Sequence, residues 1–521
     1  MKEPTITLLL SLSCCWLAAQ CPTDIMFSRQ GQIDSFPINY PGCTQIFGKI
    51  TIAESDSASI THLDSLSQIN YISDLNVYNN AALTNLRGLG SLTSVGDSLF
   101  VHGNAGLTSL NGLDILTSVG GRFFIANNIV LTSFSGLDSL ISIGGDLAVW
   151  NNTSMTSLSG LDNLTSISGS LSFYDNPALT SLSALGNLTF IGKYLDVGNN
   201  SSLTSLSGLN NLTTIGDRLS VNNNSALTNL NGLDNLTSVG KDLSLFNNAS
   251  LTTLNSLNNL TSTGGFYVST SPALTSLSGL DNLTSVSNNF FIDNNAALTS
   301  LSGLGSLISV GGTLLVYNNA AINSLDDLNN LTSVGGVLDV GYNDALTSLS
   351  GLANLTSIGG GLSIYYNSAL TSLSGLDNMD FSMIITGILI EHNPHLFLCD
   401  VKSICDYLEN GGFATISSNA PGCNNMSQIK TACGTSPVEV PFTEQEHIRV
   451  FPNLTTGILY IGSGENGDLR YRILNSMGDL ILDGLLESKG YIDISDFLSG
   501  LYYLELKKGN QSTIKKIIKT E

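Results

Sequence analysis

The stretch NDALTSLSGLANLTSIGGGLSIYYN, residues 343–367, decides the fold because nearly the same phrase recurs along most of the chain. The first leucine of its LTSL phrase recurs every 24 residues, with one step of 23. Its positions are Leu83, Leu107, Leu131, Met155, Leu179, Leu203, Leu227, Leu251, Leu274, Leu298, Ile322, Leu346 and Leu370. With a degenerate earlier copy at Ile60, this period predicts a solenoid of about fourteen coils, in which each unit buries its apolar face against its neighbours.

Within one coil the apolar residues keep fixed offsets from that leucine. They are Leu346, Leu349, Leu352, Leu355, Ile358, Leu362 and Ile364. The last two alternate with polar or outward residues, which indicates a short strand. Because Gly359 and Gly360 precede this strand in a coil of only 24 residues, no room is left for a long helix. The pattern predicts a mainly β fold in which parallel strands of successive coils lie about 4.8 Å apart.

An asparagine stands three positions before nearly every leucine of the series. The column is Asn80, Asn104, Asn128, Asn152, Asn176, Asn200, Asn224, Asn248, Asn295, Asn319, Asn343 and Asn367, with Ser271 as the exception. A polar residue this regular and this close to a strand predicts a buried ladder whose amides satisfy backbone groups at the bend.

Both ends of the repeat array carry cysteines. An apolar run after Lys2 predicts a signal peptide over residues 1–20; a lipid anchor on Cys14, Cys15 or Cys21 is the weaker alternative, because the preceding residues fit a lipobox poorly. The remaining cysteines are Cys21, Cys43, Cys399, Cys405, Cys423 and Cys433. They predict disulfide-containing caps over residues 21–59 and 396–434, around a solenoid of residues 60–395. The four C-terminal cysteines allow three pairings, and zinc is a less supported reading because they form no Cys-x-x-Cys pair.

The charge balance excludes one class of partner. The formal net charge is −22, and nucleic-acid binding requires clustered Lys and Arg. After the signal peptide no apolar stretch is long enough to suggest a transmembrane segment. We expect no cofactor and no catalysis, because no nucleophile motif is present and no loop interrupts the period with convergent polar groups.

The repeats and their flanks resemble a known family. The array, together with SRQGQIDSFPINYPGCTQIFGKITI at residues 28–52 and LCDVKSICDYLENGG at residues 398–412, is similar to the leucine-rich, receptor L-domain-like arrays of secreted Bacteroidetes-type proteins. The resemblance implies a right-handed β-solenoid with cysteine-containing caps. It implies no particular ligand.

Residues 435–521 lose the period and predict a different domain. Runs such as RVFPNLTTGILYI (449–461) and YIDISDFLSGLYYLEL (491–506) alternate apolar and polar residues between turns, which predicts a small antiparallel β-sandwich. This segment resembles the C-terminal sorting domain of type IX secretion substrates, although it has Pro-Asn-Leu at residues 452–454 where that family usually has Pro-Asn-Pro. The resemblance implies export by the type IX machinery and a secreted or cell-surface location.

Outward strand positions at offsets 17 and 19 carry the candidate ligand-binding residues. They are Phe124, Trp150, Tyr174, Phe246, Tyr317 and Tyr365. Exposed aromatic rows commonly mark surfaces that bind sugars or proteins, although strands also favour aromatic residues for packing alone. We expect Trp150 and Tyr174, on consecutive coils, to share one exposed face and to carry binding of a surface polysaccharide or protein.

Two other columns suggest alternatives. A threonine follows the leucine in most coils, and its regular hydroxyls could order water, so an ice-binding or purely structural solenoid is the competing interpretation. Asp114, Asp138 and Asp162 stand at the same offset on consecutive coils, which makes them weak calcium candidates. A solvated turn aspartate that bonds local backbone is the simpler reading.

Overall fold

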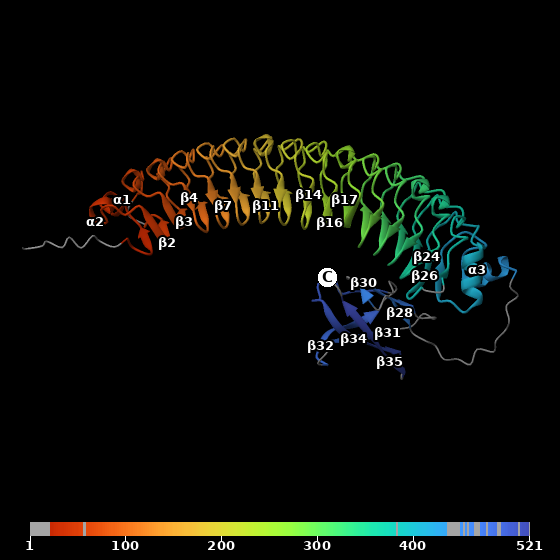
Figure 1. Cartoon of the computed structure of the whole chain (residues 1–521). Helices are drawn as coiled ribbons and strands as arrows, with labels where there is room; N and C mark the ends of the chain where they lie inside the picture. The colour runs from red at the N-terminus through yellow and green to blue at the C-terminus, as the bar shows by residue number, and fades with distance from the viewer. Residues whose placement is uncertain are drawn as a thin grey trace, which may run out of the picture. The chain divides into compact units, whose positions relative to one another are not determined.

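The computed structural model describes residues 21–55, 59–381, 384–434, 449–451, 454–455, 458–462, 469–475, 478–486, 491–508 and 511–519. The predicted signal peptide lies outside the described residues. The chain forms a β-solenoid of about 16 turns and, separately, a mainly antiparallel C-terminal domain (Figure 1). This confirms the predicted fold class. The solenoid has more turns than the predicted fourteen because strands in both cysteine-containing ends join the parallel ladder.

The chain divides into two compact units near residues 227–235. In the first unit, the longer strands are β1 (Ile25–Phe27), β2 (Gln45–Ile52), β3 (Tyr71–Tyr78), β5 (Leu99–His102), β7 (Phe123–Ala126), β9 (Leu147–Trp150), β11 (Leu171–Tyr174), β13 (Leu195–Gly198) and β15 (Leu219–Asn222). The shorter strands are β4 (Ser94–Val95), β6 (Ser118–Val119), β8 (Ser142–Ile143), β10 (Ser166–Ile167), β12 (Phe190–Ile191) and β14 (Thr214–Ile215). Its helices are α1 (Gln30–Asp34) and α2 (Phe36–Asn39), with 3-10 turns η1 (Asp64–Leu66), η2 (Arg87–Leu89) and η3 (Ser183–Leu185).

The coils of the second unit follow the same plan. Their longer strands are β16 (Ser238–Phe246), β17 (Ser262–Ser269), β19 (Phe290–Asp293), β21 (Leu314–Tyr317), β23 (Leu338–Gly341), β25 (Gly361–Tyr365), β26 (Gly387–Glu391) and β27 (Ala414–Ser417). The shorter strands are β18 (Ser285–Val286), β20 (Ser309–Val310), β22 (Ser333–Val334) and β24 (Ser357–Ile358). Helices α3 (Lys402–Glu409) and α4 (Met426–Ala432) and the 3-10 turns η4 (Asn255–Leu257), η5 (Asp326–Leu328) and η6 (Ser350–Leu352) complete it.

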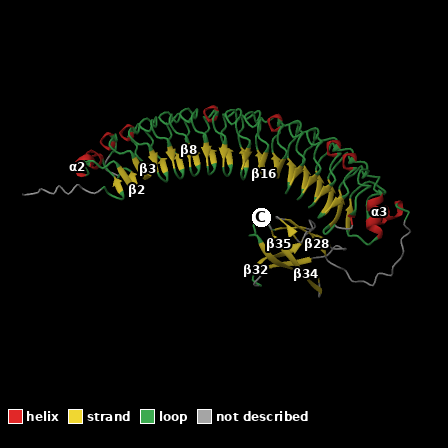
Figure 2. Ribbon diagram, in the orientation of Figure 1, coloured by secondary structure: helices red, strands yellow, loops and turns green. Residues whose placement is uncertain are grey.

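Each coil places its strand on one side and its loops or 3-10 turns on the other (Figure 2). Neighbouring long strands pair in parallel and in register, as Leu171 with Leu195 and Phe173 with Val197. The apolar offsets predicted from the sequence all point inward, and Leu346, Leu362 and Ile364 are at most 1% exposed. At Gly359 the close approach of the coils leaves no room for a side chain, because a Cβ there would lie 2.2 Å from the carbonyl oxygen of Gly335.

The predicted asparagine ladder is confirmed, and every asparagine of the column is fully buried. Asn319 shows the pattern: its Nδ2 donates to the carbonyl of Ile292 at 2.8 Å, and its Oδ1 accepts from the backbone N–H of Asn295 at 3.0 Å. One side chain therefore satisfies a donor and an acceptor at the bend after the strand. At the exception, Ser271 still donates its backbone N–H to Asn295 Oδ1 at 3.0 Å, but its hydroxyl reaches only the carbonyl of Ser269, at 3.5 Å.

The single 23-residue step lies beside this exception. Strands β16 and β17 are continuous over their coils and pair with a register shift between Val239 and Asp242. Thr263 occupies the buried position that Val or Ile holds in other coils, and its hydroxyl bonds to the carbonyls of Lys241 at 3.1 Å and Gly265 at 3.0 Å. The missing residue is thus absorbed within the ladder and opens no loop.

Disulfides close both ends of the solenoid. Cys21 pairs with Cys43, Cys399 with Cys423, and Cys405 with Cys433. Of the three pairings that the sequence allowed at the C-terminal end, the structure selects this one because Cys405 and Cys433 come from α3 and the end of α4, which pack together.

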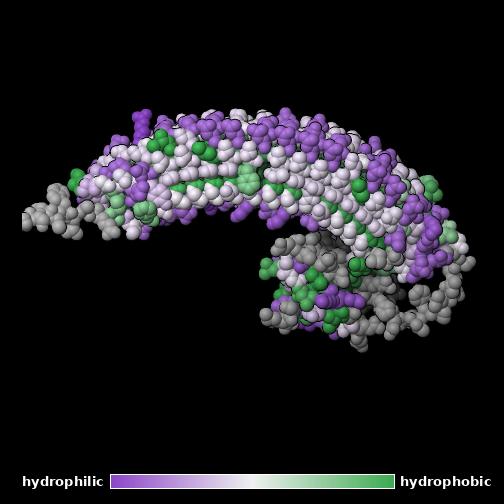
Figure 3. Space-filling view, in the orientation of Figure 1, coloured by the Kyte–Doolittle hydropathy of each residue, from purple (hydrophilic) through white to green (hydrophobic). Residues whose placement is uncertain are grey.

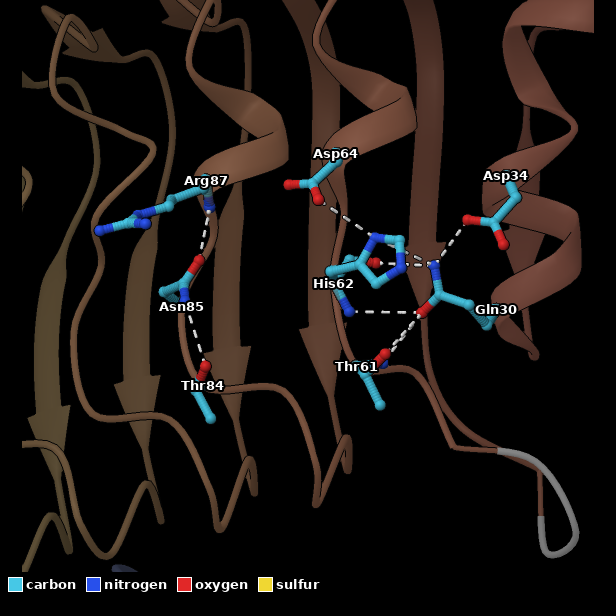
Figure 4. Close-up of polar contacts among 8 residues, drawn as sticks. All are labelled: Gln30, Asp34, Thr61, His62, Asp64, Thr84, Asn85 and Arg87. Carbon is cyan, nitrogen blue, oxygen red and sulfur yellow. Dashed lines mark hydrogen bonds and ion pairs between the residues drawn. The ribbon is translucent and has the colours of Figure 1, made fainter.

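Gln30 of α1 attaches the N-terminal cap to the first coil (Figure 4). Its Nε2 donates to Asp34 Oδ1 at 2.8 Å and to the carbonyl of His62 at 3.0 Å, while its Oε1 accepts from the backbone N–H of Thr61 at 2.9 Å. His62 Nδ1 lies 3.4 Å from Asp64 Oδ2. The polar groups of this region are therefore engaged in fixing the cap.

The C-terminal domain consists of two sheets around one core. Its strands are β28 (Arg449–Phe451), β29 (Leu454–Thr455), β30 (Ile458–Gly462), β31 (Leu469–Asn475), β32 (Leu480–Leu486), β33 (Tyr491–Asp493), β34 (Gly500–Lys508) and β35 (Gln511–Lys519). Sheet β28-β30-β33 and sheet β29-β35-β34-β31-β32 bury Leu459, Ile492, Ile473 and Leu504 between them. Pairing is antiparallel except between β29 and β35.

The asparagine ladder generates a stability prediction. Asn319→Ala should lower the free energy of unfolding by about 1–3 kcal/mol, because buried backbone groups lose their partners. Asn354→Ala is the matched control: its Nδ2 bonds to the carbonyl of Asn329 at 2.6 Å but is exposed, so water can replace it. Urea denaturation of the two variants measures the difference, and equal losses would contradict a special role for the buried column.

Candidate functional site

Side chains alternate between the core and the surface along each strand, and this alternation positions the candidate residues. In β9, Leu147 and Val149 are buried in the core, so the side chain of Trp150 points outward and is 39% exposed. Tyr174 is its register partner on β11 and is partly exposed. The ring of Tyr174 lies beside Gly198 of the following coil, where a Cβ would come within 2.3 Å of it. The two predicted residues thus occupy neighbouring outward positions.

Trp150 makes its ring contact with Phe124 rather than with Tyr174. The centroids of Phe124 and Trp150 are 5.4 Å apart in an edge-to-face arrangement. The indole N–H of Trp150 donates to Ser172 Oγ at 2.9 Å, which fixes the ring although its face remains partly exposed. An exposed tryptophan held in this way loses little side-chain entropy on binding, because its rotamer is already chosen.

Arg122 joins this group and was not predicted from the sequence. Its guanidinium lies 5.1 Å from the centroid of Phe124 and 5.8 Å from that of Trp150, within the range of a cation–π interaction. The rings continue over earlier coils, because His102 lies 6.1 Å from Phe124 and stacks on Tyr78 at 5.0 Å. Burial lowers the pKa of His102. We call Tyr78, His102, Arg122, Phe124 and Trp150 the Trp150 cluster. Arg122 could have been found by its position two residues before Phe124, which places it just ahead of the strand.

Beside this cluster, in the same unit, lies a charged group that sequence analysis also missed. Asp196, an outward residue of β13, has Arg218 at 3.7 Å, and the Arg218 guanidinium lies 5.5 Å from the ring of Tyr194. Burial raises the pKa of Asp196, while Arg218 and a hydrogen bond with Ser220 oppose that rise. The strand face of the first unit therefore combines rings, cations and a carboxylate.

The other predicted aromatics lie in the second unit. Phe246 is 38% exposed and lies 6.4 Å from Tyr267. Tyr317 and Tyr365 are 6.5 Å apart, and Tyr342 lies 5.1 Å from Tyr317 and 5.7 Å from Tyr365. The structure thus brings Tyr317 and Tyr365 into one group, to which the sequence analysis had not assigned Tyr342.

A buried carboxyl lies next to these tyrosines. Burial raises the pKa of Asp339 on β23 to about 7, against a hydrogen bond with Tyr365 that lowers it. Its Oδ1 is buried and has no hydrogen-bond partner among the described residues. Burial, followed by the carboxylates of Asp339 and Asp293, raises the pKa of Tyr317.

The aspartates considered as calcium candidates take part in local turns. Asp114 Oδ2 accepts from the N–H of Gly112 at 2.8 Å, and Asp162 Oδ2 accepts from the N–H of Gly160 at 2.9 Å. The carbonyl of Asp138 accepts from Asn163 Nδ2 at 2.7 Å. In the part of the chain that the structure describes, no group of three or more His, Cys, Asp and Glu residues is arranged to hold a metal ion.

The threonine column bonds one coil to the next. Thr299 donates its hydroxyl to the carbonyl of Thr275 at 3.2 Å, and Thr347 donates to the carbonyl of Asn323 at 3.1 Å. A second threonine column behaves in the same way, as Thr356 does with the carbonyl of Thr332 at 3.1 Å. These exposed hydroxyls therefore donate along the surface to the neighbouring coil.

Surface hydropathy follows the columns, with hydrophobic residues in rows beside rows of hydrophilic residues (Figure 3). A surface depression of about 600 Å³ lies on the last coils, lined in part by Asp344, Ser368, Pro394, His395 and Phe397. His395 Nδ1 lies 2.6 Å from the carbonyl of Ser368. Among the described residues, no helix is both long and apolar enough to cross a membrane.

Comparison with known families agrees with this geometry. The family model of the BspA type leucine-rich repeat region matches six copies over residues 117–244 and 222–337. The coils of residues 117–337 thus match BspA-type leucine-rich repeats. The model of the secretion system C-terminal sorting domain matches residues 449–520. Both resemblances drawn from the sequence are thereby confirmed. No curated protein matches the chain.

The sorting-domain match indicates where the protein is found. A type IX sorting domain indicates export, so the protein is secreted or displayed at the cell surface, and its C-terminal domain implies contact with the secretion machinery.

The buried carboxyl of Asp339 predicts a pH effect on stability. In the folded chain this group keeps its proton up to a pH of about 7, whereas the unfolded chain releases it near 3.8. The folded state therefore binds more protons between these values, and stability falls as the pH rises from about 4 to about 7 and then levels off. Asp339→Asn should remove this component, which amounts to at most about 4 kcal/mol.

The measurement compares thermal unfolding of wild type and Asp339→Asn from pH 4 to 8. Asp377→Asn, at an exposed aspartate of the same unit, is the control and should leave the pH profile of the wild type unchanged. Parallel profiles for wild type and Asp339→Asn would contradict the assignment.

Proposed function

We propose that this exported repeat protein is a non-catalytic binding scaffold that recognises a polysaccharide or a protein at a surface through its exposed strand face. The observation that carries the proposal is the Trp150 cluster. It presents a partly exposed indole that a hydrogen bond to Ser172 holds in place, next to a guanidinium within cation–π distance of two rings. Rigid aromatic and arginine side chains are the residues that most often dominate binding energy at interfaces.

The repeat architecture supports the same proposal. Side chains on successive strands repeat at about 4.8 Å, so a row of outward residues can follow an extended ligand from coil to coil. Tyr174 and the Asp196–Arg218 pair continue the row on the coils after Trp150. Ring faces would contact apolar ligand surface, while the carboxylate and guanidinium would bond to hydroxyl, amide or charged groups.

The competing ice-binding interpretation depends on threonine hydroxyls that face water. Because the hydroxyls of both threonine columns donate to carbonyls one coil away, they favour a role in joining coils. The outward aromatic row therefore supports recognition better than the threonine column supports ordering of water.

A binding array tests the proposal. The mature full-length protein should bind a subset of surface glycans or proteins, and Trp150→Ala combined with Tyr174→Ala should weaken that binding about tenfold or more, as loss of a central aromatic anchor does. Phe190→Ala is the control, because Phe190 is 49% exposed but lies on the short strand β12, which pairs with β10 and β14 and not with the strands that carry Trp150 and Tyr174. Equal binding by the double variant and the wild type would refute the assigned face, and the absence of any ligand would favour a structural surface role.

A further inference from the structure

One column of residues runs through the coils of both units, and within the second unit its side chains change abruptly from polar to aromatic. The residue just before each ladder asparagine adopts a left-handed conformation, with φ between 51° and 58° for the non-glycine residues of the column. In the earlier coils it is almost always small and polar. These residues are Asn79, Asn127, Asn151, Asp175, Asn199, Asn223, Asn247, Thr270, Asn294 and Asn318. On the next three coils the column holds Tyr342, Tyr366 and His392.

The left-handed backbone of this column disfavours the change from small polar residues to aromatic ones. Asparagine tolerates left-handed backbone, whereas a bulky side chain there is strained. The backbone bond of the column is the same in both cases, because Asn318 donates its N–H to the carbonyl of Gly341 at 2.9 Å and Tyr342 donates to that of Tyr365 at 3.0 Å. Asparagines also bond along the column, as Asn318 Nδ2 does with Asn294 Oδ1 at 2.7 Å. The column thus exchanges asparagines, which suit this backbone and bond to one another, for bulky side chains on strained backbone, and such a departure from a local rule points to function.

The three rings form one stack. Tyr342 and Tyr366 lie 4.6 Å apart at an angle of 16°, and Tyr366 and His392 lie 4.4 Å apart at 10°. Tyr342 and Tyr366 are nonetheless 38% and 39% exposed. Since stacked faces cover one another, the stack presents mainly ring edges and phenol groups, which suits hydrogen bonding to a polypeptide better than flat stacking of a sugar ring.

The surface next to the stack adds a hollow and negative charge. The depression of about 600 Å³ lies on the same coils, two or more residues further along each, with Asp344 and Phe397 in its lining. Residues 242–401 contain eleven Asp and Glu residues and no Lys or Arg. Asp293 lies close enough to Tyr317, whose ring contacts Tyr342, to influence the ionisation of Tyr317. The first unit differs, because its aromatic cluster includes Arg122.

We propose that Tyr342, Tyr366, His392 and the adjoining hollow form a second interaction surface, which binds a polypeptide segment rich in arginine and lysine. Phenol oxygens and the Asp344 carboxylate would accept hydrogen bonds from guanidinium and ammonium groups, and the hollow would take an apolar side chain beside Phe397. This surface goes beyond the proposed function and shares no residue with the Trp150 cluster, so each can fail without the other.

The test measures binding of a fluorescent hexa-arginine peptide to the mature full-length protein at pH 8 and low salt. The double variant Tyr342→Asn, Tyr366→Asn restores the residue that the column uses elsewhere. We expect about a tenfold loss of affinity or more, together with a melting temperature no lower than that of the wild type. Asp344→Asn should also weaken binding, and added salt should weaken it further.

The controls separate this surface from general attraction to an acidic protein. The double variant keeps every carboxylate, so unchanged binding of the peptide would overturn the proposal. Failure of the wild type to bind the peptide, or tighter binding of neutral oligosaccharides through the same two tyrosines, would overturn it as well. Trp150→Ala should leave peptide binding unchanged while it weakens array ligands, which distinguishes failure here from failure of the proposed function.

Discussion

The buried asparagine column is the interaction on which the solenoid depends. Each coil must bend sharply after its strand, and the bend leaves backbone donors and acceptors that no strand partner can satisfy. One asparagine side chain bonds to both kinds of group, as Asn319 does with Ile292 and Asn295. Because an unpaired buried polar group costs about 1–3 kcal/mol, a residue with a donor and an acceptor at its tip is favoured at this bend, and Ser271 is the one exception in the column that begins at Asn80 and ends at Asn367.

Other columns repeat the same solution at the surface. Threonine hydroxyls and exposed asparagine amides donate to carbonyls of the preceding coil, so much of the polar side-chain chemistry of a coil is used to join it to its neighbour. Such an arrangement leaves few positions free to vary. The outward strand positions and the left-handed column are among them, and there the Trp150 cluster and the Tyr342–Tyr366–His392 stack occur.

The two candidate surfaces differ in charge although the coils that carry them are nearly identical. Arg122 and Arg218 lie among the rings of the first unit, whereas the stack of the second unit lies in a stretch without basic residues. A repeat scaffold permits this because a substitution at an outward position changes the ligand chemistry of one coil without disturbing the core that its neighbours share. Export, which the sorting domain indicates, places both surfaces where they can meet external partners.

The sequence by itself determined the period, the buried apolar offsets, the asparagine ladder and the change of domain after the cysteine-rich end, because these depend on local chemistry repeated in every coil. It also placed Trp150 and Tyr174 on adjacent outward positions. Only the tertiary structure decided the pairing of Cys399 with Cys423, the contact of Trp150 with Phe124 and Arg122, and the stacking of Tyr342 on Tyr366. These features depend on the lateral direction of side chains between coils, which a one-dimensional period does not contain.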